Sequence, residues 1–144
     1  MEIITYQEFQ GDLFSATNDF ALCHCVSRDF NMGKGIATIF KNRYGRVEEL
    51  KAQNANIGGC AFLNDNGKFL FYLVTKEKYF QKPTYESLAQ SLVCMKNHCL
   101  RHGVTKIAMP KIGCGLDKLV WNRVREMILD TFSNSGIAIR VYSI

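Results

Sequence analysis

Short apolar runs alternate with stripes of helical spacing along the chain, and this pattern limits the possible folds most strongly. Phe20 to Val26 is a nearly continuous apolar run of strand length, as expected of a strand covered on both faces. Ile3 to Phe9 predicts a second strand of a buried sheet, and Lys106 to Met109 and Ile137 to Tyr142 predict two more. Strands that alternate with helices indicate an α/β fold with a mixed, mainly parallel sheet covered on both faces.

Three segments place apolar residues every three or four positions, which predicts helices. The first lies between Gly33 and Leu50, where a helix opens at a glycine loop. The second begins after Thr84, a good capping residue, and ends near His102, before a glycine at the position that favours a left-handed cap. The third spans Trp121 to Phe132.

Two further strand-like runs indicate an antiparallel pair. Cys60 to Asn64 and Lys68 to Thr75 are separated by Asp65, Asn66 and Gly67. Asn-Gly supplies the positive φ angles of a tight hairpin turn, so we expect these two runs to pair as neighbours.

Length and composition indicate one globular domain over residues 1–144. Hydrophobic residues make up 47% and charged residues 22%, too apolar for a disordered chain. The net charge of +5 favours anionic partners, and it serves solubility equally well. The sequence contains no apolar run long enough for a membrane span and does not start like a secretory signal, so we expect an intracellular protein without a membrane partner.

Six cysteines form no C-x-x-C pair and no Cys/His group with zinc-finger spacing, so no metal site is predicted. In a reducing compartment such cysteines are usually small buried hydrophobes. Cys114 differs because it lies inside a glycine-rich loop, where its thiol would be close to a ligand. No histidine is placed to make it a recognisable nucleophile.

Two glycine loops, each between a strand and a helix, are the strongest functional signal. One is Met32-Gly-Lys-Gly-Ile-Ala37 and the other is Lys111-Ile-Gly-Cys-Gly-Leu-Asp117. Such loops cradle phosphate, because glycine lets backbone N–H groups approach an anion and a helix start adds positive potential. At corresponding ends of parallel strands, the two would meet in the crevice where α/β sheets bind ligands.

Two common phosphate-binding motifs are absent. The chain has no Gly-x-x-x-x-Gly-Lys-Ser/Thr, and Gly33-x-Gly35 does not continue to a third glycine because position 38 is threonine. Kinase-like and dehydrogenase functions therefore lose their main support.

Several segments in order make the chain resemble the macro domain family. They are Gly11-Asp-Leu-Phe14, His24-Cys-Val-Ser27, Met32-Gly-Lys-Gly-Ile-Ala37, Leu73-Val-Thr-Lys76, Lys82-Pro-Thr-Tyr85 and Met109-Pro-Lys-Ile-Gly-Cys-Gly-Leu-Asp117. Within the family, the chain is most similar to the terminal ADP-ribose protein glycohydrolases, whose relatives include bacterial antitoxins that remove ADP-ribose from DNA. This resemblance covers nearly the whole chain and implies a three-layer α/β/α domain.

The resemblance implies a lysine and an aspartate as the catalytic pair, which fall on Lys76 and Asp117. It implies that Asp12, followed by Leu13, contacts adenine and that Ser27 lies near the distal ribose. The remaining implied substrate-binding residues belong to the two glycine loops or to the last strand: Gly33, Gly35, Ile36, Ile112, Gly113, Cys114, Gly115 and Tyr142. Asp12 also fits a turn or helix cap, and Tyr142 also fits a partly buried core position, with adenine stacking as its functional alternative.

A lysine amine captures an aldehyde as a Schiff base, and the distal ribose can open to an aldehyde. The amine must be uncharged to attack. A closed cleft and the nearby cations Lys78 and Lys111 are expected to favour that form. Asp117 would act as general base or acid during ring opening and release of the lysine adduct.

The resemblance therefore implies an enzyme that removes mono- or terminal ADP-ribosyl groups from protein carboxylates, with nucleic-acid adducts and O-acetyl-ADP-ribose as further substrates. It also implies a role in reversing ADP-ribosylation, including the DNA damage response, in the nucleus or cytoplasm. We expect a monomer, with ADP-ribose and ADP-ribosylated proteins, DNA or RNA as partners and no cofactor.

Two other functions remain open. The two glycine loops alone would serve a non-catalytic reader of ADP-ribose, although a reader does not need the lysine and aspartate. The basic surplus would suit a nucleic-acid-binding protein, but the chain has no basic-aromatic stripe or known nucleic-acid module. Arg28 departs from the acidic residue typical of the human-type pattern, which leaves substrate preference open.

Overall fold

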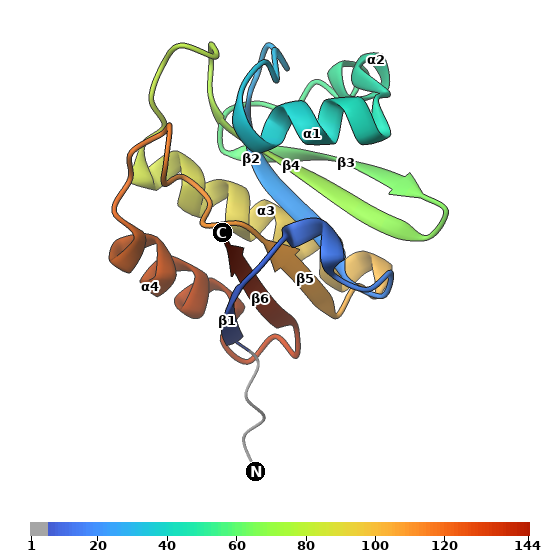
Figure 1. The fold of residues 1–144 in the computed structure, drawn as a ribbon, viewed down its shortest axis with the longest axis vertical. Helices are drawn as coiled ribbons and strands as arrows, with labels where there is room; N and C mark the ends of the chain where they lie inside the picture. The colour runs from blue at the N-terminus through green and yellow to red at the C-terminus, as the bar shows by residue number, and fades with distance from the viewer. Residues whose placement is uncertain (1–5) are drawn as a thin grey trace.

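The computed structural model describes residues 6–144. Its elements follow in the order β1 (Tyr6–Gln10), η1 (Leu13–Ser15), β2 (Ala21–Ser27), α1 (Gly35–Tyr44), α2 (Val47–Ala52), β3 (Gly59–Asp65), β4 (Lys68–Lys76), α3 (Tyr85–His102), β5 (Lys106–Met109), α4 (Trp121–Phe132) and β6 (Ala138–Ser143). Figure 1 shows these elements around one central sheet. Among the described helices, none has the length and apolar character needed to cross a membrane.

The sheet has the strand order β1-β6-β5-β2-β4-β3. Of the described strand pairs, only β3 and β4 are antiparallel, and the other neighbours run parallel. The mixed, mainly parallel sheet predicted from the sequence is therefore confirmed. Because β1, β6, β5, β2 and β4 point the same way, their carboxyl ends lie along one edge of the sheet, where ligands bind in α/β folds.

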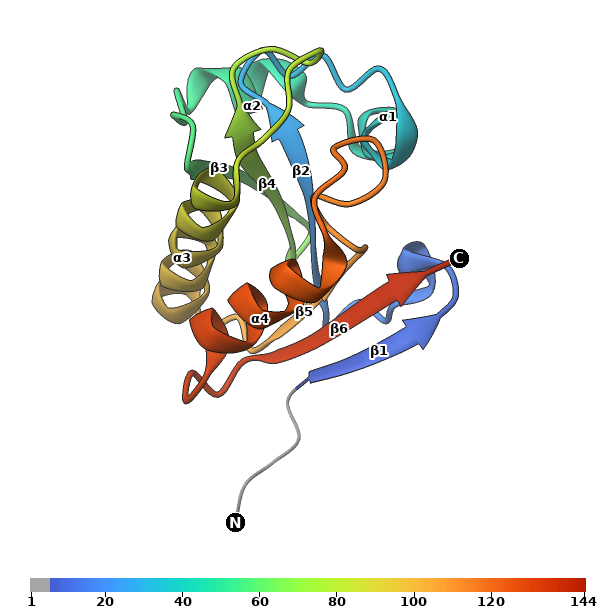
Figure 2. The ribbon, with the colours of Figure 1, turned by 90° about the vertical axis from the view of Figure 1, so that its left-hand side faces the viewer.

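Helices cover both faces of the sheet, as Figure 2 shows. One core lies under α3 and α4 and contains residues such as Leu88, Ile128 and Phe71. The other lies under α1 and α2 and contains Phe40 and Tyr72. Adjacent residues of β4 face opposite cores, because side chains alternate along a strand, which explains why this strand is apolar from Phe69 to Val74. The three-layer α/β/α arrangement is confirmed.

The hairpin and the long helix form as the sequence predicts. Asn66 and Gly67 have φ angles of 53° and 92° and reverse the chain between β3 and β4. Thr84 accepts a hydrogen bond from the Ser87 backbone N–H at 3.0 Å and caps α3. Gly103 ends that helix in the left-handed conformation.

The predicted first strand differs from the structure. The expected range begins at Ile3, outside the described residues, and the described strand runs from Tyr6 to Gln10. It lies at the sheet edge beside β6, and four of its five residues are exposed. The prediction of a strand is confirmed over the described residues, but the strand is exposed and not covered, because among the described strands only β6 lies beside it.

The single helix predicted between Gly33 and Leu50 is also wrong. The chain forms two helices, α1 and α2, separated by Gly45 and Arg46 with φ angles of 58° and 55°. Phe40 and Leu50, one from each helix, pack into the same core. Because α1 and α2 bury residues in the same core, the apolar residues keep a helical spacing across the break between the two helices.

Candidate active site

A cleft of about 540 Å³ opens at the carboxyl ends of β2, β4 and β5. Its volume is within the usual range for sites that hold small organic ligands. Three segments line it, each directly after one of these strands: residues 31–37 with the end of β2, residues 76–82, and residues 110–117. The two glycine loops predicted from the sequence therefore meet at one cleft.

The first glycine loop leaves the start of α1 open toward the cleft. The helix begins at Gly35, and its N-cap residue Lys34 makes no side-chain hydrogen bond to the first turn. Gly35 has a φ angle of 62°. Met32, just before it, has a φ angle of 49°, which is uncommon for a residue with a side chain. Uncapped backbone N–H groups at a helix start can receive an anion such as phosphate.

The second glycine loop is held by its own packing. Gly113 has a φ angle of 74°, and its carbonyl accepts a hydrogen bond from the Leu119 backbone N–H at 2.7 Å. A Cβ added at Gly113 would lie 2.9 Å from a Leu119 methyl and 3.1 Å from a Leu88 methyl. Glycine at this position therefore serves the core behind the loop, in addition to any contact with a ligand.

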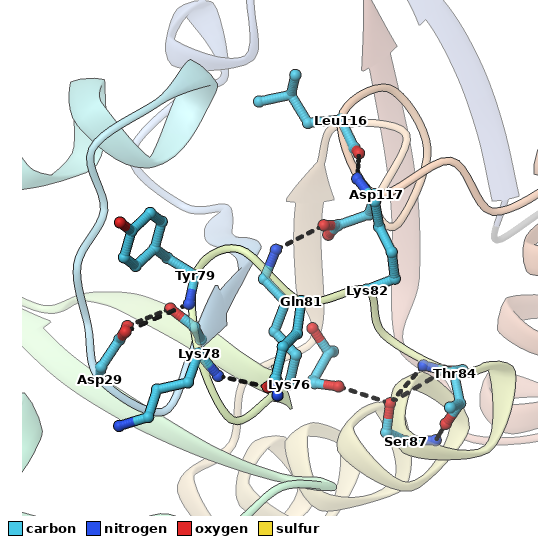
Figure 3. A network of polar contacts seen from close by, with 12 residues as sticks. Asp29, Lys76, Lys78, Tyr79, Gln81, Lys82, Thr84, Ser87, Leu116 and Asp117 are labelled. Atoms are coloured by element: carbon cyan, nitrogen blue, oxygen red, sulfur yellow. Dashed lines mark hydrogen bonds and ion pairs between the residues drawn. The ribbon is translucent and has the colours of Figure 1, made fainter.

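Lys76 and Asp117 form an ion pair inside the cleft (Figure 3). Lys76 Nζ donates a hydrogen bond to Asp117 Oδ1 at 2.7 Å, and 15% and 16% of the two side-chain surfaces are exposed. The residues are 41 positions apart in the sequence. Both residues that the resemblance named as catalytic are thus in contact and largely shielded from solvent.

The backbone around Lys76 is held on two sides. The Arg28 backbone N–H donates to the Lys76 carbonyl at 2.8 Å, where the β2–β4 ladder shifts register. On the other side, the Ser87 hydroxyl donates to the Thr75 carbonyl at 2.8 Å and joins the start of α3 to the strand (Figure 3). These bonds fix where the long Lys76 side chain begins.

Lys82 ties the rim of the second loop to the strand end. Its ammonium group donates to the Leu116 carbonyl at 2.7 Å, as Figure 3 shows. Leu116 reaches toward the first loop, because a Cβ added at Gly35 would lie 3.5 Å from a Leu116 methyl. The two glycine loops therefore approach each other across the cleft through this exposed leucine.

Ser27 lines the cleft, and Asp29 determines its position. The Ser27 hydroxyl donates to Asp29 Oδ1, which also accepts from the Asn31 backbone N–H at 3.1 Å. The Tyr79 backbone N–H donates to the other carboxylate oxygen at 3.2 Å. Burial raises the pKa of the Asp29 carboxyl, but the hydrogen bonds from Ser27, Asn31 and Tyr79 together outweigh it, so the pKa lies below its usual value. Asp29 thus connects the chain after β2 with the segment after β4.

Cys25 lies on β2 and lines the cleft. Burial, followed by the charge of Asp117, raises the pKa of its thiol to about 12. Burial likewise raises the pKa of the Cys114 thiol, with a smaller opposing effect from Lys111. Both thiols are therefore protonated at neutral pH and line the cleft as uncharged groups, so neither is a strong nucleophile.

The residues that the resemblance assigned to adenine lie outside the cleft lining, at the carboxyl ends of β1 and β6. Asp12 caps η1 by accepting a hydrogen bond from the Phe14 backbone N–H at 3.0 Å, and Leu13 is buried. Tyr142 is stacked on Phe9, with 5.6 Å between ring centroids. The simpler expectations, a cap for Asp12 and a partly buried position for Tyr142, describe their observed contacts.

The other predicted loop residues divide similarly. Gly33, Gly35, Ile36, Ile112, Gly113 and Cys114 line the cleft, whereas Gly115 does not. Gly115 has a φ angle of 77°, so its observed property is the turn conformation. Lys78 was expected to place its cation near the Lys76 amine, but its side chain points away from that amine in Figure 3. The charged partner of Lys76 is instead Asp117.

Sequence reasoning missed several residues that line the cleft. Tyr79 and Phe80 follow β4 and expose 54% and 69% of their surfaces, and they pack edge to face against each other. Asn31 and Leu116 also line it. The sequence did contain a signal for this exposed aromatic rim, because two adjacent aromatic residues lie among lysines and outside any periodic pattern.

The comparisons with known proteins agree with this geometry. A model described as Macro domain matches residues 23–128. The chain is 47% identical over 141 residues to the ADP-ribose glycohydrolase OARD1 of Homo sapiens, which covers 98% of this chain and 91% of that protein. This likeness extends through both glycine loops and the segment between them.

Solved structures show the same fold at lower identity. The macrodomain of Thermus aquaticus DarG has a TM-score of 0.85 at 22% identity, covering 96% of this chain and 98% of that one. Thermosipho africanus DarTG in complex with ADP-ribose has a TM-score of 0.81 at 19% identity, covering 93% of this chain and 40% of that one.

Proposed function

The chain belongs to the macro domain family, and we propose that it is an ADP-ribose glycohydrolase that removes mono- or terminal ADP-ribosyl groups from acidic side chains of proteins. The contact between Lys76 and Asp117 inside a cleft bounded by two glycine loops is the observation that most supports this activity. The 47% identity to a human ADP-ribose glycohydrolase over 98% of this chain supports the same class of enzyme.

ADP-ribose would lie along the carboxyl edge of the sheet. Its diphosphate would contact the N-terminus of α1 and the second glycine loop, where Lys34 and Lys111 add positive charge. The adenine would extend toward Asp12 and Tyr142 at the ends of β1 and β6, since these parallel strands end at the same edge as the cleft. The distal ribose would then reach Lys76 and Asp117.

The first chemical requirement is an uncharged amine. Asp117 is the nearest proton acceptor, because its Oδ1 lies 2.7 Å from Lys76 Nζ. Transfer of one proton converts the ion pair into a neutral amine and a neutral carboxylic acid, a change favoured when bound ligand expels water from the cleft. This role for Asp117 replaces the earlier expectation that Lys78 favours the neutral amine.

The neutral amine would attack C1 of the distal ribose. The bond from C1 to the acyl oxygen breaks, and the glutamate or aspartate of the modified protein leaves as a carboxylate with the bonding electrons. The ribose ring then opens as a proton moves from the attached nitrogen to the ring oxygen, which leaves a Schiff base on Lys76.

Water would release the product. Asp117 first gives the proton that it took from Lys76 to solvent. It then takes a proton from the water that adds to the Schiff base, and the resulting carbinolamine collapses to free lysine and ADP-ribose. Each turnover consumes one water and produces one carboxylate, one ADP-ribose and one proton. The amine, the carboxylate and solvent water carry all the proton transfers, so the proposed chemistry needs no metal or cofactor.

We also propose that nucleic-acid adducts and O-acetyl-ADP-ribose are substrates, because the cleft would hold the ADP-ribose part that they share. The exposed rim formed by Tyr79 and Phe80 would face the carrier macromolecule. A role in the DNA damage response, in the nucleus or cytoplasm, belongs to the same proposal.

The decisive experiment mixes the purified protein with a labelled protein that is mono-ADP-ribosylated on glutamate and follows label release. Lys76→Ala is measured beside it, together with the ADP-ribose affinity of both proteins. Release by the wild type, and binding without release by the variant, would support the proposal. Equal affinity with no release by the wild type would indicate a reader of ADP-ribose instead.

A further inference from the structure

A second cluster of reactive side chains lies outside the cleft. Cys60, Cys94 and His98 each place one metal-binding atom within 4.8 Å of the other two. None of the three lines the cleft. Cys60 is 34 residues from Cys94, so the zinc-finger spacing considered in the sequence could not reveal this group.

The fold holds these three residues in a rigid frame. Cys60 lies on β3, and Cys94 and His98 lie one helical turn apart on α3, where residues four apart share a face. One turn earlier on the same helix, the Ser91 hydroxyl donates to the Gly59 carbonyl at 2.9 Å and the Val74 carbonyl at 3.1 Å. The helix is therefore fixed over the strand beside the cluster, and Figure 2 shows α3 along this side of the sheet.

The spacing of the two thiols is closer to a metal site than to a disulfide. The Cys60 and Cys94 sulfurs are 3.4 Å apart. Two zinc–sulfur bonds of about 2.3 Å at a tetrahedral angle place the sulfurs about 3.8 Å apart, whereas a disulfide requires about 2.05 Å. To bind zinc, the two sulfurs would have to move apart by roughly 0.4 Å, whereas to form a disulfide they would have to move together by roughly 1.4 Å.

The imidazole of His98 is positioned to add the third ligand. Its Nδ1 is buried and has no hydrogen-bond partner among the described residues. The Phe62 ring, 5.0 Å away between centroids, packs against the imidazole. A buried ring nitrogen without a partner is costly, and a metal ion would satisfy it.

We propose that Cys60, Cys94 and His98 bind one Zn²⁺ ion through two thiolates and one imidazole nitrogen, with a water molecule as the fourth ligand. Two thiolates and one histidine are a donor set that suits Zn²⁺. Binding releases the two thiol protons, and the two thiolates balance the charge of the ion. The half-buried Cys94 and His98 give the ion a route from solvent.

Such a site would join β3 to α3. β3 is an edge strand, so one of its sides lacks a strand partner among the described residues. A metal that binds the folded chain and not the unfolded chain stabilises the fold in proportion to its affinity. The proposed role is therefore structural and independent of the glycohydrolase reaction.

The test begins with the full chain, reduced and stripped of metal, which is titrated with Zn²⁺ against a chromophoric chelator. We expect one tight Zn²⁺ per chain and a melting temperature that rises with zinc. Co²⁺ in the same site should give a thiolate charge-transfer band and the intense visible bands of a tetrahedral complex. Circular dichroism of each variant establishes that it is folded.

The variants assign the ligands. Cys94→Ser, at a half-buried position that should tolerate the change, and His98→Gln should each weaken zinc binding more than about 100-fold and remove the cobalt bands. Cys99→Ala and His102→Gln remove the neighbouring thiol and imidazole on α3, so they serve as controls and should retain one tight Zn²⁺.

Three outcomes would overturn the proposal. The first is reduced wild-type protein that binds no zinc tightly, and the second is undiminished binding in both ligand variants. The third is a Cys60–Cys94 disulfide formed with a small-molecule disulfide oxidant in a chain that holds no zinc when reduced. That last result would identify a redox pair in place of a metal site.

Discussion

Asp117→Ala separates the chemistry from folding, because it removes the carboxylate 2.7 Å from the Lys76 amine. Removing one partner of a fully buried pair costs about 3–5 kcal/mol, and exposed pairs contribute about 0–1 kcal/mol. Since 15% and 16% of the two side chains are exposed, we expect an intermediate loss in the free energy of unfolding. A loss of about 2 kcal/mol corresponds to a fall of roughly 4–8 °C in melting temperature, which leaves the chain folded at 25 °C.

The catalytic effect of the same substitution should be larger. Loss of a general acid–base group slows reactions by about 10²–10⁴-fold, or roughly 3–5 kcal/mol in the barrier. ADP-ribose affinity should change by less than about tenfold, because the glycine loops, and not Asp117, are assigned to the diphosphate. Asp117→Ala also removes the anion that favours the charged form of the Lys76 amine, so the amine can give its proton to solvent and still attack the ribose. Without Asp117 to activate water, the Schiff base on Lys76 should accumulate.

Intact mass spectrometry after exposure to substrate measures this accumulation directly. Asp117→Ala should gain the mass of one ADP-ribosyl group, and peptide mapping should place it on Lys76. Lys76→Ala is the matched control, which should bind ADP-ribose, release no label and gain no mass. Calorimetry with ADP-ribose on both variants tests whether binding survives.

Two results would refute this reasoning. An active Lys76→Ala enzyme would exclude the covalent mechanism outright. Inactive variants without any trapped adduct would leave Lys76 as an electrostatic or positioning residue, and the 2.7 Å ion pair would then be the functional state.

Three further predictions concern the loops, metal and pH. Gly35→Glu should reduce ADP-ribose affinity more than about tenfold, measured by calorimetry. Gly113→Glu should reduce the affinity and also lower the melting temperature, because the new side chain collides with Leu119. Unchanged affinity in both variants would exclude the two-loop site. Chelator-treated enzyme should keep full turnover well below its melting temperature, and a requirement for added zinc or magnesium would contradict the amine–carboxylate chemistry. Burial lowers the pKa of His24 to about 3 in the folded chain. In the unfolded chain this histidine takes up a proton below about pH 6.5, so falling pH stabilises the unfolded chain first. The free energy of unfolding should therefore fall by about 2 kcal/mol from pH 7 to pH 5, measured with urea, and His24→Leu should remove this part of the pH dependence.

The fold was largely predictable from the sequence because local and long-range requirements agree in most elements. The run Phe20–Val26 is apolar because β2 is covered on both faces, and Asn66-Gly67 supplies the turn of the hairpin. The break at Gly45 and Arg46 could not be predicted from periodicity, because Phe40 and Leu50 occupy one core from two different helices.

The candidate site was predictable where topology brings chain segments together. Parallel strands end at one edge of a sheet, so the segments after β2, β4 and β5 had to meet. The contact between Lys76 and Asp117 required more, since a lone lysine and a lone aspartate carry no signal on composition, and only the family pattern singled them out. Asp29 was missed because its role, holding Ser27 and Tyr79 together, depends on a contact 50 residues along the chain.

The cluster of Cys60, Cys94 and His98 could not be predicted from the sequence, because strand order does not determine which turn of α3 lies over a given residue of β3. α3 nevertheless links the cluster to the catalytic strand: Ser87 bonds the Thr75 carbonyl beside Lys76, Ser91 bonds the Val74 carbonyl, and Cys94 follows on the next turn. Since these bonds already hold α3 on β4, zinc would bind to a helix that is fixed before the metal arrives. Zinc should therefore raise the melting temperature and leave the rate of label release at 25 °C unchanged. If Cys94→Ser instead lost rate together with zinc, the two sites would be coupled through α3.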